Sequence, residues 1–134
     1  MQKYAAYFYP EHPKIRVAKW PEYDVQELLK ESGLLITDYS SIAMDFAYMK
    51  KPLFYYQFDY EMFRRGQYKE GYFSYQEDGF GPVSDNLEAL LGQVEQCVKN
   101  NFKMDAEYKA RTKHFYTQVD QSNCRRNYEA IRAI

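Results

Sequence analysis

An apolar run that changes abruptly into a polar segment and then into a helical pattern is the feature that most constrains the fold of this chain. Residues 34–48 read LLITDYSSIAMDFAY. The apolar run predicts a strand, the TDYSS segment a turn, and the spacing of residues 42–49 a helix. Residues 50–52 (KKP) end this helix, and another strand follows at 53–57. Strands that alternate with helices in this way are typical of a parallel sheet, so we predict an α/β fold.

The remaining segments extend the same alternation. Apolar spacing and helix breakers predict one more strand, a short extended piece and four more helices. These are a strand at 4–9, extended residues 15–17, helices at 22–32 (capped by Asp24 and followed by Gly33), 85–100 and 104–116, and a final helix after residues 120–123. We therefore predict a Rossmann-like parallel sheet in three layers with a helical C-terminus, in a single domain over residues 1–134.

Polar residues follow the predicted strands at the edge where a parallel sheet collects ligands. Because the carboxyl ends of such strands share one edge, His12, residues 38–41 and residues 57–59 would lie together. Free backbone N–H groups at a helix start, with the Ser40 and Ser41 hydroxyls beside them, suit a phosphate. Ser, Thr and Asp are also the ordinary capping residues, so capping without a ligand is the simpler interpretation of the local pattern.

Residues 58–83 form a long segment that is rich in aromatic residues, charges and glycine but has no sustained periodicity. Long loops in a compact domain are usually functional or disordered, and aromatic richness favours order. We predict an ordered active-site loop here. Arg64 and Arg65, with Lys69, could clamp a diphosphate, because guanidinium groups match phosphate oxygens. A solvated run of charges is the equal alternative.

Composition and missing motifs exclude several classes of function. A formal net charge of -1 argues against broad nucleic-acid binding. No apolar run approaches the ~20 residues that span a bilayer, and the N-terminal residues lack a secretory pattern, so we expect a cytoplasmic protein. The dinucleotide fingerprint, the P-loop, the zincin motif and the nucleophile elbow are all missing from the sequence. Cys97 and Cys124 lack metal-ligand spacing, so we expect free thiols and no metal site.

Four stretches of the chain carry a resemblance to a known family. They read ELLKESGLLITDYSSIAMDFAYMKKPLFYYQFDYEMF, GYFSYQEDGFGPV, NNFKM and DQSNCRRNYEAI. In this order they resemble the C-terminal part of CDP-glycerol:poly(glycerophosphate) glycerophosphotransferases, enzymes that polymerise teichoic acid chains, over residues 22–134. The resemblance implies the C-terminal lobe of a two-lobed GT-B architecture, the lobe that binds the CDP part of the donor.

The resemblance also implies roles for individual residues. His12 would correspond to a catalytic histidine that follows a strand in the family, although Pro10 stands where the family has arginine and residues 120–123 lack the family's glycine. A histidine at this position can donate to a phosphate or act as general acid or base near neutral pH, and a turn residue beside Pro13 is the alternative. The residues that would bind the CDP-alcohol donor are Asp38, Tyr39, Ser40, Ser41, Arg64, Arg65 and Asp78.

The resemblance thus implies the donor-binding lobe of a bacterial enzyme that moves glycerol phosphate from CDP-glycerol to a teichoic acid-like or polysaccharide acceptor and releases CMP. CDP-glycerol or CDP-ribitol would be the donor, and no cofactor is firmly implied. The family works at the inner face of the plasma membrane, so peripheral association of the complete protein is also implied.

The N-terminal lobe of the family, which carries acceptor contacts, has no counterpart in this sequence. We therefore expect a fragment or a degenerate relative that binds donor weakly and has no turnover alone. Two alternatives stay open at this point. The chain could be a GT-B lobe that binds a nucleotide sugar, or a non-catalytic interaction module that uses its aromatic loop.

Overall fold

A computed structural model describes residues 12–19, 21–66 and 71–134 of the chain. The chain divides into two compact units, residues 1–32 and 33–134, which are described separately. The strand predicted at residues 4–9 lies outside the described residues.

The described part of the first unit, residues 12–19 and 21–32, contains a turn and one short helix. The turn spans residues 12–15, where the Ile15 amide donates to the His12 carbonyl oxygen at 2.9 Å, and no strand forms at residues 15–17. Helix α1 covers Val25–Glu31. The prediction of Asp24 as its cap is confirmed, because the Asp24 carboxylate accepts from the amides of Gln26 and Glu27 at 2.7 and 3.2 Å. The helix is therefore held by its cap, since it buries no residue.

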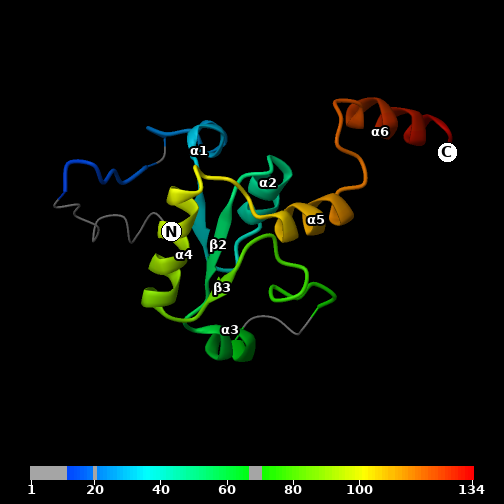
Figure 1. Cartoon of the computed structure of the whole chain (residues 1–134). Coiled ribbons are helices and arrows are strands. Elements are labelled where there is room, and N and C mark those ends of the chain that lie inside the picture. The colour runs from blue at the N-terminus through cyan, green and yellow to red at the C-terminus, as the bar shows by residue number, and fades with distance from the viewer. Residues whose placement is uncertain (1–11, 20, 67–70) are drawn as a thin grey trace. The chain divides into compact units, whose positions relative to one another are not determined.

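The second unit carries the sheet and five helices (Figure 1). Its elements in chain order are β1 (Leu35–Thr37), α2 (Ile42–Tyr48), β2 (Leu53–Tyr56), α3 (Tyr60–Gly66), β3 (Val83–Ser84), α4 (Leu87–Lys99), α5 (Ala106–Phe115) and α6 (Asn123–Arg132). The three strands are parallel and pair in the order β1-β2-β3, with Ile36 opposite Phe54 and Tyr55 opposite Val83. The predicted alternation of strands and helices in a parallel sheet is confirmed.

Helices cover both faces of this sheet. Helix α4 lies on one side, and α2 and α5 lie on the other (Figure 1). Successive residues of β2 point to opposite faces, so Phe54 packs with Leu90 and Cys97 of α4, while Tyr55 faces the other layer. The second unit is thus a three-layer α/β arrangement, as the continuous apolar character of residues 53–56 predicts.

The layer opposite α4 holds the largest buried side chains. Tyr55, Phe46 and Phe80 have no exposed surface. The Phe80 ring lies 5.3 Å from Phe115 and 6.0 Å from Tyr116, centroid to centroid, so α5 packs on the segment before β3. The Tyr116 hydroxyl in turn donates to the Met44 carbonyl oxygen at 2.8 Å, which ties α5 to α2.

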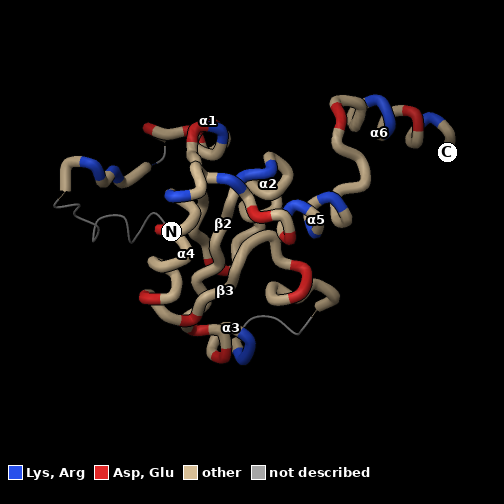
Figure 2. Tube along the Cα trace, viewed as in Figure 1, with Lys and Arg blue, Asp and Glu red and all other residues tan. Residues whose placement is uncertain are grey.

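The long segment after β2 is more regular than its sequence indicates. The predicted loop at 58–83 contains helix α3 and, after residue 71, a run of turns that leads to β3. Helix α3 buries none of its residues, so it leaves no apolar stripe in the sequence. Figure 2 shows the charges of this helix, acidic in its first turn and basic in its last, where Arg64 and Arg65 lie.

Candidate functional site

The turn between β1 and α2 presents two serines that are used differently. The Ser40 hydroxyl oxygen accepts a long hydrogen bond of 3.4 Å from the Ile42 amide, which is a weak form of capping. Ser41 occupies the N-cap position, yet its side chain makes no capping bond. Both side chains are exposed. Capping therefore accounts for one hydroxyl in part and leaves the other to contact solvent or a ligand.

Helix α2 has seven residues, about two turns. The aligned peptide dipoles that would favour an anion at its start are correspondingly few. The chemistry of this site is therefore better judged from side chains than from the helix terminus.

Arg64 reaches the same place from α3. Its guanidinium carbon lies 5.2 Å from the centre of the Tyr60 ring, and its Nε donates to the Tyr60 hydroxyl at 3.0 Å. A cavity of about 460 Å³ brings Arg64 together with Ser40 and Ser41. We call it the serine-arginine cavity; its lining is Tyr39, Ser40, Ser41, Ala43, Met44, Tyr55, Phe63, Arg64, Phe73 and Tyr75. Hydroxyls and a guanidinium around one hollow are hydrogen-bond donors that suit phosphate oxygens.

Tyr39 braces this arrangement. Its ring stacks on Phe63 of α3, with centroids 3.6 Å apart and planes 3° from parallel, and its hydroxyl donates to Asp59 Oδ1 at 2.9 Å. Burial raises the pKa of the Tyr39 phenol well above its ordinary value, and the hydrogen bond to Asp59 raises it further, so the phenol stays protonated as a donor. The Tyr75 hydroxyl donates to the Tyr39 carbonyl oxygen at 3.3 Å. The turn after β1 is thereby fixed to α3.

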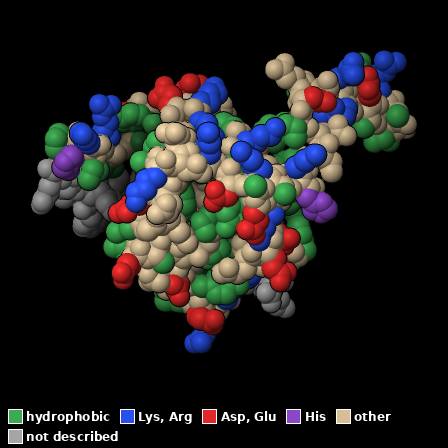
Figure 3. Space-filling model, viewed as in Figure 1, with side chains coloured by type: hydrophobic (Ala, Val, Ile, Leu, Met, Phe, Trp, Pro, Cys, Tyr) green, Lys and Arg blue, Asp and Glu red, His purple; other side chains and the backbone are tan. Residues whose placement is uncertain are grey.

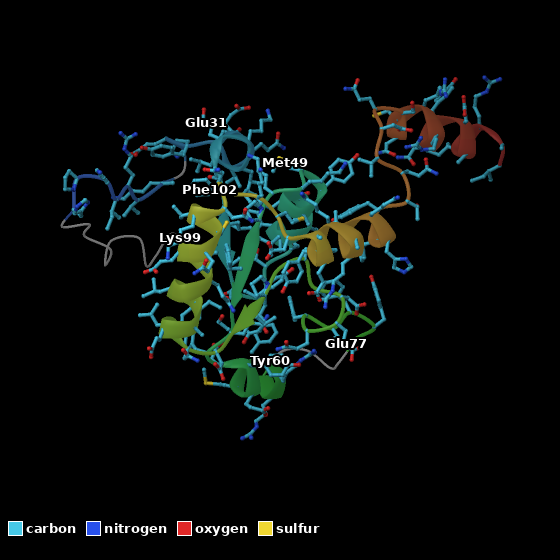
Figure 4. All side chains as sticks on the ribbon, in the orientation of Figure 1. Glu31, Met49, Tyr60, Glu77, Lys99 and Phe102 are labelled. Carbon is cyan, nitrogen blue, oxygen red and sulfur yellow. The ribbon has the colours of Figure 1, made fainter. Side chains whose placement is uncertain are left out.

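The residues that follow β1 and β2 meet as the topology predicts. The Gln57 side-chain Nε2 donates to the Asp38 carbonyl oxygen at 3.2 Å, and Asp59 receives the Tyr39 hydroxyl. A second cavity, of about 730 Å³, opens at the ends of β2 and β3. We call it the acidic cavity; it is lined by Gln57, Phe58, Asp59, Tyr60, Glu61, Met62, Ser74, Tyr75, Gln76, Val83 and Asp85. Figure 4 places Tyr60 and Glu77 toward this end of the sheet, with Met49 and Phe102 at the other.

The other residues predicted to bind donor lie in different settings. Arg65 is exposed, and the lining of the serine-arginine cavity does not include it. Asp78 closes a turn, with its Oδ2 accepting from the Ser74 amide at 2.8 Å, and Asp38 Oδ1 accepts from the Tyr39 amide at 2.6 Å. These two carboxylates thus hold backbone, whatever else they contact.

His12 belongs to the first unit and is exposed there. Its Nδ1 accepts from the Lys14 amide at 3.2 Å, so the turn role considered as the alternative is present locally. Its relation to the phosphate remains a prediction.

Two aromatic residues of the site, Phe63 and Tyr75, have no place in the sequence prediction. The high density of aromatic residues between positions 58 and 75 was the available signal, but it does not say which rings meet a turn some twenty to forty residues earlier.

A third cavity, of about 540 Å³, lies at the amino ends of the strands, between α4 and α5. Core side chains such as Phe54, Phe80 and Met104 line it, and none of the residues predicted to bind the donor is among its lining residues. Within residues 12–19, 21–66 and 71–134, no group of three His, Cys, Asp or Glu side chains could hold a metal ion. None of the helices in those ranges is both long and apolar enough to cross a bilayer.

Surface charge is mixed on the face that Figure 3 shows, with basic and acidic side chains interspersed.

The chain is similar to known proteins over most of its length. The model of the CDP-glycerol:poly(glycerophosphate) glycerophosphotransferase family matches residues 10–133. The minor teichoic acid biosynthesis protein GgaB of Bacillus subtilis (strain 168) is 40% identical over 106 residues, which are 79% of this chain and 11% of that protein. The teichoic acid poly(glycerol phosphate) polymerase of the same strain is 32% identical over 85 residues, 63% of this chain and 11% of the polymerase.

A relative with a different polyol in its name is also similar. The teichoic acid poly(ribitol-phosphate) polymerase of Bacillus spizizenii (strain ATCC 23059 / NRRL B-14472 / W23) is 28% identical over 80 residues, 60% of this chain and 12% of that protein. The chain therefore spans about a ninth of the length of these relatives. No solved structure gave a significant match.

Proposed function

Because the chain belongs to the CDP-glycerol:poly(glycerophosphate) glycerophosphotransferase family, we propose that it is the donor-binding part of a glycerophosphotransferase. The complete enzyme transfers glycerol phosphate from CDP-glycerol to a growing teichoic acid-like or polysaccharide acceptor and releases CMP. The named activities belong to relatives of which the matched part of this chain covers about a ninth, so this chain supplies one part of the machinery.

The observation that carries the proposal is the convergence of Ser40, Ser41 and Arg64 on one cavity. A diphosphate presents several anionic oxygens, and two hydroxyl donors with a guanidinium can each bind one. Tyr39 keeps the serine turn and α3 together through its stack on Phe63, so the donors are held in place before the ligand arrives.

In the reaction, an acceptor hydroxyl attacks the β-phosphorus of the donor. A bond forms between the acceptor oxygen and phosphorus, the hydroxyl proton is released, and the bond from phosphorus to the CMP oxygen breaks. CMP leaves with the electron pair of that bond. Phosphoryl transfer of this kind depends on positioning and on stabilising the charge of the transferring group, which is the role proposed for Arg64 and the two serines. His12 would protonate or neutralise the leaving phosphate, Arg65 would add a second cation, and Asp38 and Asp78 would hold the turns that shape the site.

We place the second unit as part of the C-terminal lobe of a GT-B fold, with a separate N-terminal lobe that binds the acceptor. The donor is CDP-glycerol or CDP-ribitol, since relatives named for both polyols are similar to the chain. The complete protein would act in the cytoplasm at the inner face of the plasma membrane, where it would associate peripherally. The chain alone is expected to bind donor without turnover.

The test is binding of CDP-glycerol, measured by isothermal titration calorimetry, to the chain and to the double variant Ser40→Ala/Ser41→Ala. Loss of hydrogen bonds to a charged group costs about 1.5–3 kcal/mol each, so affinity should fall at least about tenfold. Ser122→Ala is the matched control, because Ser122 starts α6 without a side-chain capping bond. Unchanged affinity in the double variant, or no binding of any CDP compound by the unmodified chain, would reject the proposal.

A further inference from the structure

We propose that the acidic cavity binds a neutral, hydroxyl-rich part of the same donor, so that the two cavities divide the ligand by charge. This inference rests on the function proposed above. Its starting point is that the two cavities are neighbours: Tyr75 lines both, and the Tyr39 hydroxyl, from the wall of one, donates to Asp59 in the wall of the other at 2.9 Å. One extended ligand can therefore enter both.

The acidic cavity is built to accept hydrogen bonds and to repel anions. Three carboxylates line it, from Asp59, Glu61 and Asp85, and no Lys or Arg of the described ranges 12–19, 21–66 and 71–134 is among its lining residues. A phosphate placed there would meet like charges, whereas the hydroxyls of a diol would find acceptors. The cavity therefore selects the opposite chemistry to the serine-arginine cavity.

Gln57 supplies an observation independent of the carboxylates. Its side chain is only 3% exposed, its Nε2 donates to the Asp38 carbonyl oxygen, and its backbone amide donates to the Ser84 carbonyl oxygen at 2.8 Å. Among the described residues, no donor reaches its Oε1. Gln57 lines the acidic cavity, and no fully buried polar side-chain atom in the described part of the chain lacks a partner, so its Oε1 is not both fully buried and unpaired. A buried carboxamide fixed at its nitrogen thus leaves its oxygen to a ligand's hydroxyl.

A CDP-alcohol has hydroxyl-rich groups on both sides of its diphosphate, the polyol on one side and the ribose on the other. Both offer hydroxyl donors on neighbouring carbons, so the recognised chemistry is the same. Which of them enters the acidic cavity is decided by comparing ligands that carry none, one or both of these groups.

The experiment compares inorganic pyrophosphate, CDP and CDP-glycerol as ligands of the chain, of Asp85→Asn and of Glu88→Gln. Asp85 is an exposed residue at the rim of the cavity, so its replacement should leave the fold intact. Glu88 lies in the first turn of α4, is exposed and lines neither cavity, so Glu88→Gln removes an equal charge nearby.

We expect Asp85→Asn to weaken CDP-glycerol binding about tenfold, the value of one hydrogen bond to a charged group, while pyrophosphate binds equally or more tightly because a like charge is gone. If the cavity recognises the ribose, Asp85→Asn should weaken CDP binding as it weakens CDP-glycerol binding. If the cavity recognises the polyol, the affinity for CDP should change as that for pyrophosphate does. Glu88→Gln should change the affinity for pyrophosphate as Asp85→Asn does, but should not weaken CDP-glycerol binding.

Two results would overturn the inference. In one, Asp85→Asn leaves all three affinities unchanged or lowers them equally. In the other, the unmodified chain binds CDP-glycerol no more tightly than pyrophosphate, which would mean that the acidic cavity adds nothing to donor binding. Failure of the unmodified chain to bind any of the three would instead reject the proposed function, and this extension with it.

Discussion

The phenol of Tyr55 lies in the interior of the second unit, next to the aromatic cluster of the candidate site. The residue has no exposed surface, and its ring packs edge-on against Tyr75 at 5.1 Å between centroids. Burial raises its pKa from 10.0 to about 12, although the Phe80 amide, which donates to the phenol oxygen at 3.5 Å, acts in the opposite direction. The folded chain therefore keeps this proton under conditions where an unfolded chain releases it.

This difference predicts how stability depends on pH. Below pH 10 both states hold the proton, and the favourable contribution of neutral Tyr55 is fully present; it is lost as the pH rises from 10 through about 12, because the unfolded state then binds fewer protons. The pKa of Tyr75 is raised by burial and adds in the same direction.

We expect Tyr55→Phe to reduce the decline in the free energy of unfolding between pH 10 and 12, measured by urea denaturation at a series of pH values. Tyr72→Phe, at a position that is 92% exposed, is the matched control and should follow the unmodified chain. A Tyr55→Phe curve parallel to that of the unmodified chain over the whole range would contradict this assignment.

At the scale of elements, two glycines differ in whether a side chain would fit at their positions. Gly92 lies inside α4, and a Cβ built on it meets nothing within 4 Å. A Cβ on Gly81 would overlap the Leu53 carbonyl group and lie 3.0 Å from Leu53 Cδ1. The second glycine therefore lets the segment before β3 approach β2, whereas the first only weakens a helix.

Gly92→Ala should raise the free energy of unfolding by about 0.5–1 kcal/mol, because alanine costs less conformational entropy in a helix. Gly81→Ala should lower it by roughly 1–3 kcal/mol or more, because backbone must move to make room. Chemical denaturation of the two variants side by side measures both effects. Destabilisation by Gly92→Ala would contradict the description of Gly92, and unchanged stability in Gly81→Ala would contradict that of Gly81.

The elements that the sequence predicts well are those with a cap or a buried stripe. Asp24 starts α1 as expected. Helix α4 starts at Leu87, two residues after the predicted start at 85, because Asn86 caps it by accepting from the Ala89 amide at 2.9 Å. Helix α3 escaped prediction because none of its side chains is buried, and β3 because it has only two residues. Asn101 and Phe102 both have a positive φ of 54°, a conformation for which the Phe102 side chain gives no signal.

At the scale of the whole second unit, Phe80 joins three segments. Its ring is fully buried and lies near Phe73 of its own loop and near Phe115 and Tyr116 at the end of α5. Removing it would open a cavity where the loop, α5 and the sheet meet.

Phe80→Ala should therefore cost about 3–5 kcal/mol of the free energy of unfolding, and thermal or urea denaturation measures the loss. Phe115→Ala is the comparison, because Phe115 is 41% exposed and leaves a smaller void. Equal losses in the two variants would argue that the Phe80 site can collapse on itself.

The part of the candidate site that depends only on strand topology was predictable from the sequence. Parallel strands bring residues 38–41 and 57–59 to one edge, and the hydrogen bond from Gln57 to the Asp38 carbonyl oxygen confirms it. The partner of Tyr39 was not predictable, because the stack on Phe63 depends on the angle at which α3 leaves β2. Nor could the acidic cavity be foreseen, since its residues come from three separate segments of the chain that only the fold brings together.

The order β1-β2-β3, in which each strand pairs with its neighbour in the chain, also bears on how the second unit assembles. Parallel sheets fold slowly when their pairings join distant segments, because loop-closure entropy must be spent before any contact forms. Here each pair of neighbouring strands is joined by one connecting segment. The segment between β1 and β2, which contains α2, is shorter than the segment between β2 and β3. We therefore expect the βαβ unit of β1, α2 and β2 to form first, and β3 and α4 to be added to it.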